Sequence, residues 1–414
     1  MQSLKLFFYL YIMLVPTFQI FMCGSVKLFT WTLFTSIIIV LILRKANKIF
    51  FNKSELTLIF LVIALNIFYV LLLEKNFFYI RFSYVIILSI LFAKILGEYF
   101  SLDELITFVS KIYMIVISIM VLEYIAYMLG NQKIISEVLV CEISDITQYK
   151  TLSNNFSNLL GIPIRGLNFP FMGPQVASQM SAVSFLWFFI IWASDRNRYS
   201  HLFYWAALSL TLLIISPSAT IIIALLLVVG FTSIAYLYYN HKHIAQNHIR
   251  KIVTTERFFA TILIIIIGIY VTLKFALINY QDLDYIIDKY ILGHFNILDN
   301  VSVMEALFGI GLDDLNKYIS GSPTEIGILS QLLRVGIIGI LIFGIFLLYV
   351  IKPIAGIIEK IFFQKKYFIL ASLTTLLIYI LSDIHYEVIF RDGATELFIL
   401  HLSLFLALVK KYRY

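Results

Sequence analysis

The apolar positions of this chain form long, nearly uninterrupted runs, and polar residues gather between the runs. Each run has about 17 to 25 residues, enough for a helix to cross a hydrocarbon core about 30 Å thick. We therefore expect an all-α fold, a polytopic membrane helical bundle with about 12 transmembrane helices, because helices satisfy their own backbone hydrogen bonds in lipid. The spans are expected at residues 6–22, 26–43, 55–73, 77–96, 105–129, 176–193, 202–216, 219–239, 258–278, 326–350, 367–384 and 395–409.

Composition supports this prediction and excludes several classes of protein. Of the 414 residues, 61% are hydrophobic and 13% are charged, and the mean hydropathy is +0.95. A soluble core cannot absorb that much apolar surface, so we treat residues 1–414 as a single integral membrane domain. The net charge of +7 fits attraction to anionic lipid, and nucleic acid is not an expected partner.

The distribution of Lys and Arg predicts which side each connection faces. With both termini cytoplasmic, the inner segments carry most of the basic residues, as the positive-inside rule requires. These are Lys5, Arg44, Lys45, Lys48, Lys53, Arg196, Arg198, Lys242, Arg250, Lys251, Arg257, Lys352, Lys360, Lys365, Lys366, Lys410, Lys411 and Arg413. The longer outer segments carry fewer, namely Lys27, Lys75, Lys133, Lys150, Arg165, Lys289, Lys317 and Arg391.

Two connections are much longer than the rest, residues 130–175 and 279–325, and both face outward in this topology. The first is rich in Asn, including Asn168, and the second is rich in acids, including Asp313 and Asp314. Such residues suit hydroxyl-rich ligands such as sugars. The alternative is that the loops are solvated connections that close helix pairs.

The span at 202–216 is short, about 22 Å at helical rise, and it ends in Ser216-Pro217-Ser218-Ala219-Thr220. One interpretation is a helix pair that stops below the outer surface and leaves a polar floor. The other is an ordinary tight turn.

Arginine residues on the outer side are candidates for binding a diphosphate. Arg165 lies in a Gly- and Pro-rich stretch directly before a span, and Arg391 lies in the last outer turn. A guanidinium stays charged and binds two phosphate oxygens at once. The alternative for Arg165 is a non-catalytic contact with lipid headgroups, although the outer ends of spans are poor in Arg.

Arg334 and Glu325 form a second pair of candidates. Arg334 is nine residues past Glu325, which corresponds to about 13 Å along a helix. An intramembrane Arg is costly and is a functional candidate by default. Glu325 is a candidate general base, or else an acid stabilised by a helix N-terminus. Arg81, Lys111 and Lys274 are further charges expected within spans, without a motif beside them.

The chain shows no metal signature. His241 and His243 fall on the inner side, where His-x-His is typical of a solvated loop. Cys23 and Cys141 are expected near the outer side, and two cysteines make no disulfide framework.

Several features of the chain form one pattern: two long outer loops, Arg165-Gly166, the Ser216–Thr220 elbow, Gly309-Ile-Gly311 and Arg334-x-Gly336-x-x-Gly339. In this pattern the chain resembles the O-antigen polymerase and ligase superfamily. The motifs span roughly residues 160–350. Ligase-like members carry a His where this chain reads Ser322-Pro323-Thr324-Glu325, and an Arg in the elbow where it has Pro217-Ser218. These departures favour the polymerase branch over the ligase.

The resemblance implies a GT-C-like membrane glycosyltransferase of the bacterial inner membrane that needs no metal and no cofactor. It would join undecaprenyl-diphosphate-linked oligosaccharides into a surface polysaccharide at the periplasmic face. Arg165 and Glu325 would be catalytic, Arg165, Arg334 and Arg391 would bind the diphosphate, and Asn168, Asp313 and Asp314 would bind sugars. The implied partners are these lipid-linked oligosaccharides, membrane lipids and a polysaccharide chain-length regulator.

Two further classes of function stay open at this stage. A lipid-linked oligosaccharide flippase or polysaccharide transporter would be expected to show two related halves, and the chain shows no internal repeat. A glycosyltransferase that uses polyprenyl monophosphate sugars typically has an acid in the first outer loop, and Cys23 to Lys27 contains none.

Overall fold

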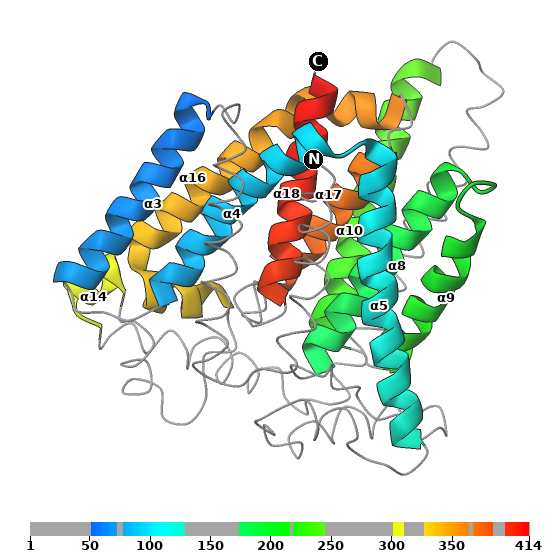
Figure 1. Ribbon diagram of the computed structural model, residues 1–414, viewed down its shortest axis with the longest axis horizontal. Coiled ribbons are helices and arrows are strands. Elements are labelled where there is room, and N and C mark those ends of the chain that lie inside the picture. Colours follow the sequence, from blue (N-terminus) through cyan, green and yellow to red (C-terminus); the bar gives the residue numbers. More distant parts are fainter. Residues whose placement is uncertain are drawn as a thin grey trace.

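The computed structural model describes residues 51–72, 78–128, 174–215, 218–244, 301–309, 327–363, 367–383 and 394–413, and these ranges contain helices and no strand (Figure 1). The helices are α3 (Lys53–Leu72), α4 (Phe78–Tyr99), α5 (Leu102–Met128), α8 (Pro174–Ser194), α9 (Ser200–Ile215), α10 (Ala219–Ile244), α14 (Val303–Phe308), α16 (Gly327–Phe363), α17 (Tyr367–Asp383) and α18 (Ala394–Arg413). The prediction of an all-helical protein is confirmed for this part of the chain.

Every predicted span that falls in the described residues is a helix, with ends that differ by a few residues in most cases. The largest difference is at α16, which was expected to end at residue 350 and continues to Phe363. The expected spans 6–22, 26–43 and 258–278 lie outside the described residues. The short helix α14 was not expected, because six residues give no periodic signal.

Polar residues at the helix starts explain where several helices begin. Asn52 precedes α3, and its Oδ1 accepts a hydrogen bond from the Glu55 N–H at 2.8 Å, while Glu55 Oε2 accepts one from the Asn52 N–H at 2.8 Å. Ser302 and Glu305 form the same reciprocal cap at α14. Such capping boxes satisfy N–H groups that a helix leaves unpaired.

Among the helices that the structure describes, three are long and apolar enough to cross a membrane, over Leu102–Leu122, Ala177–Ser194 and Val335–Ile354. Shorter apolar helices cover Ser200–Ile215, Thr220–Ala235 and Tyr367–Asp383. Large apolar side chains are also exposed on the outer surface of the bundle, for example Phe60, Phe231 and Leu348. The described part of the chain therefore has membrane-protein character.

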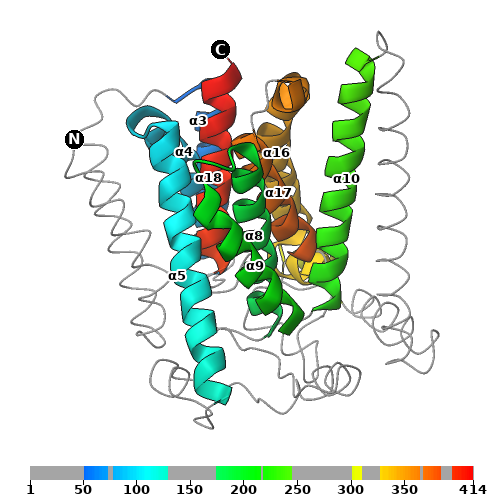
Figure 2. The same cartoon turned by 90° about the vertical axis from the view of Figure 1, so that its right-hand side faces the viewer.

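The bundle is held around α8, α17 and α18. Helix α8 packs on α5, α9 and α17, and α18 packs on α4 and α17; Figure 2 shows α8, α17 and α18 between α5 and α10. Helices α4 and α18 approach closely at Gly97, where an added Cβ would lie 3.8 Å from the Ala407 Cβ. Small residues allow such approaches, which stabilise helix pairs in lipid by van der Waals contact.

Cations gather at one end of the bundle, which we call the basic end. Three contacts bring its elements together: Lys411 Nζ donates to the Phe100 carbonyl at 2.6 Å, Arg198 pairs with Asp103 at 3.0 Å, and Lys94 pairs with Glu55. Lys53, Arg196, Arg198, Lys410 and Lys411 belong to helix ends or turns on this side, and Lys352 is in α16 three residues after Tyr349, which reaches Glu55. Among the described residues, Arg81 is in the first turn of α4 and Arg334 is about two turns into α16, both toward the opposite end.

Helix α16 is broken at Gly336, whose φ of 64° and ψ of 179° are not helical. Pro353 is also inside this helix. In Figure 1 the last part of α16 lies across the top of the bundle, and Figure 2 shows this part end-on. The apolar stretch Val335–Ile354 contains both Gly336 and Pro353.

The break at Gly336 yields a stability prediction. A Cβ at Gly336 would collide with the backbone of Leu307 and Gly309, and the positive φ with extended ψ is a glycine conformation. We expect Gly336→Ala to destabilise the protein by about 3 kcal/mol or more, measured as a lower thermal unfolding temperature in detergent.

Gly344→Ala is the matched control, because a Cβ at Gly344 meets nothing within 4 Å. Ala is the better helix former by about 0.5–1 kcal/mol, so this variant should be as stable as the parent or slightly more stable. Equal unfolding temperatures for the two variants would contradict the role assigned to Gly336.

Candidate functional site

Most of the site residues expected from the sequence lie outside the described residues. These are Arg165, Asn168, Asp313, Asp314, Glu325 and Arg391. Arg334 is in the first part of α16, two residues before the break at Gly336 and directly before the apolar stretch that begins at Val335. The structure therefore defines the framework from which these residues extend.

Two parts of the sequence motif, Gly309 and Gly336, are packed backbone to backbone. Gly309 follows the last turn of α14 with a φ of 84°, and its N–H donates to the Glu305 carbonyl at 2.6 Å. The Cβ position of Gly336 is occupied by the Leu307 carbonyl and the Gly309 nitrogen. Contact at this distance requires glycine at Gly336, so the motif holds α14 against the break in α16.

The elbow between α9 and α10 is fixed to the start of α8. Ser218 is buried, and its N–H donates to Ser178 Oγ at 3.2 Å. Ser178 is in the second turn of α8, so the elbow lies about one helical turn below the beginning of that helix. Ser216 and Pro217 of the expected elbow lie outside the described residues.

Small polar residues are buried in α8 and α17, and we call this set the polar seam. It comprises Gln179, Ser184, Ser372, Thr375 and Ser382, all fully buried. Gln179 Nε2 donates to Ser382 Oγ and joins the two helices near the end opposite the basic end. Gln179 Oε1 and the hydroxyls of Ser184, Ser372 and Thr375 have no hydrogen-bond partner among the described residues.

The polar seam offers neutral donors and acceptors and no charge. Groups of this kind can hold hydroxyl groups, and an unpaired buried polar atom costs about 1–3 kcal/mol unless it finds a partner. Gln179 and Ser382 hold the beginning of α8 beside the end of α17. The segment with Arg165 directly precedes α8, and the segment with Arg391 directly follows α17.

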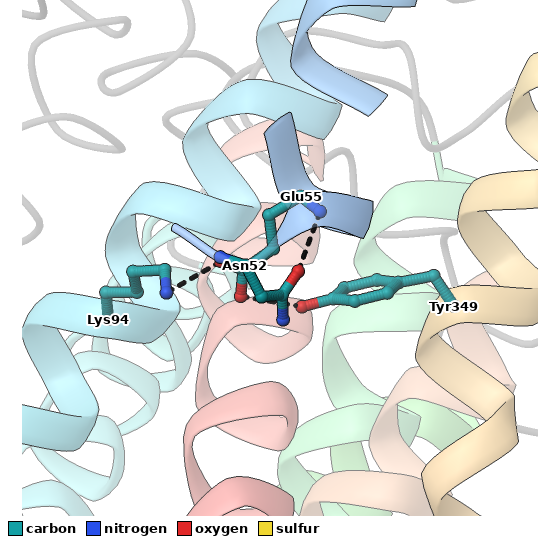
Figure 3. A network of polar contacts seen from close by, with 4 residues as sticks. All are labelled: Asn52, Glu55, Lys94 and Tyr349. Atoms are coloured by element: carbon teal, nitrogen blue, oxygen red, sulfur yellow. Dashed lines mark hydrogen bonds and ion pairs between the residues drawn. The ribbon is translucent and has the colours of Figure 1, made fainter. Parts of the chain in front are cut away.

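A buried ion pair near the basic end was not expected from the sequence. Figure 3 shows Lys94 of α4 and Tyr349 of α16 directed at Glu55, at the start of α3. Lys94 Nζ lies 2.7 Å from Glu55 Oε2, and the Tyr349 hydroxyl donates to Glu55 Oε1 at 3.0 Å. Both charged side chains are about 95% buried, with exposed fractions of 4% and 5%.

Both carboxylate oxygens of Glu55 have partners, and Oε2 also accepts a hydrogen bond from the Asn52 N–H. Lys94 Nζ in addition lies 5.2 Å from the centroid of the Phe51 ring. One carboxylate therefore joins three helices, of which α3 and α4 are consecutive and α16 is far from both in sequence. The signal that could have revealed it is the Asn52-x-x-Glu55 cap at the start of a span, combined with Lys94 inside the next span.

The centre of the bundle is an aromatic cluster around His401 of α18. The His401 ring stacks on Tyr113 of α5 at 5.2 Å and also contacts the rings of Trp187 and Tyr379. Tyr113 is hydrogen bonded through its hydroxyl to His401 Nε2, and Trp187 Nε1–H donates to Ser110 Oγ at 3.0 Å. The cluster joins α5, α8, α17 and α18. We assign it a role in packing, because every member is buried.

Other charges expected within spans behave differently. Lys111 is exposed on the surface of α5, Arg81 is in the first turn of α4, and Lys274 lies outside the described residues, as do Cys23 and Cys141. No group of three or more His, Cys, Asp and Glu residues gathers in the ranges that the structure describes.

Comparisons of the chain with protein-family models, curated proteins and solved structures find no match.

The Glu55–Lys94 pair predicts a characteristic pattern of stabilities. Removing one partner leaves an uncompensated buried charge, so Lys94→Met or Glu55→Gln should each cost about 3–5 kcal/mol. The double variant should recover much of this loss, because neither charge then remains. Thermal unfolding of the four proteins in detergent gives the coupling between the two residues.

The exposed pair between Arg198 and Asp103 is the matched control. Both side chains are more than half exposed, and exposed pairs contribute little, so Arg198→Gln should leave the unfolding temperature almost unchanged. Additive losses in the double variant of Glu55 and Lys94 would contradict the pairing.

Proposed function

We propose that this protein is a bacterial inner-membrane polysaccharide polymerase. It joins undecaprenyl-diphosphate-linked oligosaccharide repeat units into a surface polysaccharide of the O-antigen type, at the periplasmic face. In this proposal the chain has about 12 transmembrane helices with both termini in the cytoplasm, and residues 130–175 and 279–325 are periplasmic loops.

The charge distribution supports this orientation. Lys and Arg gather at the basic end of the described bundle, which the positive-inside rule assigns to the cytoplasm. The polar seam near Gln179, the elbow at Ser218 and the start of α16 then lie toward the periplasm. A lipid-linked substrate presents its diphosphate and sugars on that side.

The observation that carries the proposal is the contact between Gly309 and Gly336. These residues belong to separate parts of the resemblance to polymerases, and they are packed together through backbone atoms alone. A glycine is required at Gly336 for steric reasons, which gives the motif a physical purpose. It fixes the end of α14 against the break in α16, two residues after Arg334.

The proposed reaction is an inverting glycosyl transfer that needs no metal ion. A sugar hydroxyl of the incoming repeat unit attacks the anomeric carbon at the reducing end of the growing chain. The new bond forms as the bond to undecaprenyl diphosphate breaks, and the diphosphate leaves with the electron pair. Arg165, Arg334 and Arg391 are proposed to stabilise the charge that develops on the diphosphate.

Glu325 is proposed to accept the proton of the attacking hydroxyl. Asn168, Asp313 and Asp314 are proposed to hold sugar hydroxyls, because amide and carboxylate oxygens accept their hydrogen bonds. A chain-length regulator is the proposed protein partner.

Deleting the gene tests the reaction class. A polymerase mutant should still cap its lipid core with a single repeat unit and lose only the long chains, as seen by gel electrophoresis of the surface polysaccharide. Loss of the single repeat unit as well would indicate a flippase or a ligase and would overturn the proposal.

Arg165→Ala tests the catalytic assignment. Removing one group that stabilises transition-state charge typically costs about a hundredfold or more in rate, so long chains should disappear while the protein still accumulates in the membrane. Arg165→Lys should retain partial activity, because Lys keeps the charge and loses the two-oxygen contact. Lys352→Gln, at the basic end, serves as a control that should polymerise normally. Full activity of Arg165→Ala would remove this residue from the site.

A further inference from the structure

The α8–α9 hairpin carries a continuous row of aromatic rings on its outer surface, which we call the aromatic row. Phe185, Phe189, Trp192, Phe203 and Tyr204 follow one another with ring centroids 5.7, 5.6, 4.9 and 6.1 Å apart. Phe189, Phe203 and Tyr204 are 42%, 46% and 75% exposed. In a membrane protein, rings exposed on the outside of the bundle contact lipid.

The aromatic row begins at the basic end and extends toward the membrane interior. Phe185 is nine residues before Ser194, the last residue of α8, which corresponds to about 14 Å along the helix. This depth covers the headgroup, the glycerol and the upper part of an acyl chain. Trp and Tyr rings concentrate at this level of a bilayer because each has an apolar body and a polar N–H or O–H group, whereas the Phe rings of the row are wholly apolar and suit acyl chains.

A cation stands at the headgroup end of the row. The Arg196 guanidinium lies 5.0 Å from the centroid of the Trp192 ring. Arg196 forms no ion pair with any described residue, whereas Arg198 in the same turn forms a salt bridge with Asp103 at 3.0 Å. The hydrogen bond to Asp103 raises the pKa of Arg198, whose charge is already balanced. Arg196 is thus the cation of this turn that remains able to bind an anion.

We propose that the α8–α9 hairpin binds an anionic phospholipid of the cytoplasmic leaflet. Its phosphate pairs with Arg196, and its acyl chains lie along the aromatic row from Trp192 toward Phe185. Charge complementarity identifies this occupant, because the basic end carries cations and anionic lipid is the abundant anion at that surface. This binding is independent of the proposed polymerisation, which takes place at the opposite end of the bundle.

Quenching of Trp192 fluorescence by brominated lipid tests the proposal. The full-length protein is placed in phosphatidylcholine bilayers, and brominated phosphatidylglycerol or brominated phosphatidylcholine is added at equal mole fractions. The signal of Trp192 is the difference between the parent protein and Trp192→Phe. We expect brominated phosphatidylglycerol to quench it at lower mole fraction than brominated phosphatidylcholine.

Two charge variants identify the residue responsible. Arg196→Gln should weaken the preference for phosphatidylglycerol about fivefold, the effect of one cation near an anionic surface. Lys352→Gln removes the same charge from an exposed position at the same end, and the preference should be unchanged. High salt should reduce the preference in the parent and not in Arg196→Gln.

Three results would overturn the proposal. The first is equal quenching of the parent protein by both brominated lipids, which would show nonspecific contact. The second is equal loss of preference in Arg196→Gln and Lys352→Gln, which would show a diffuse charge effect. The third is displacement of phosphatidylglycerol by a small molar amount of polyprenyl phosphate, which would show that the site takes a different lipid.

Discussion

Lipid tails are as apolar as leucine side chains, so helices inside a membrane gain little free energy by exchanging lipid contacts for contacts with each other. Specific partners must instead be selected by close packing and by hydrogen bonds between helices. The described bundle shows both. Tyr113 with His401, Trp187 with Ser110, Gln179 with Ser382 and Ser218 with Ser178 each join a different pair of helices. The arrangement of the bundle depends on these few polar contacts.

The same constraint decides how the functional parts are positioned. Gln179 and Ser382 hold the beginning of α8 beside the end of α17, and Ser178 holds the elbow that begins α10. The glycine contact at Gly336 brings the segment before α16 to the same side of the molecule. The proposed donors of positive charge extend from these elements. The core of the bundle therefore anchors the ends of the chain segments that contain the proposed catalytic residues.

The sequence was sufficient to predict helices such as α5 and α8, because a long apolar run in an otherwise polar context allows little else. The capped start of α3 was within a few residues of its expected position for the same reason. Tertiary features were not predictable in this way. The pairing of Glu55 with Lys94 and Tyr349 depends on which helices are neighbours, and a hydropathy pattern carries no such information. The break at Gly336 was also missed, since a glycine within an apolar run is compatible with a continuous helix. The rise of about 13 Å expected from Glu325 to Arg334 stays a prediction, because Glu325 lies outside the described residues.

The Glu55–Lys94 pair also has a consequence for biosynthesis. In the proposed topology, Lys94 alone would be expensive to place in a membrane, but its partner is on the helix synthesised immediately before it, so α3 and α4 would leave the translocon together with these two buried charges already paired. Tyr349 is 294 residues later than Glu55, and it reaches the carboxylate only after most of the chain has been inserted. The Glu55–Lys94 pair would thus lower the cost of inserting α4, and the Tyr349 hydroxyl would bind Glu55 only after α16 has been inserted. A single carboxylate serves first as an insertion partner and then as an assembly point.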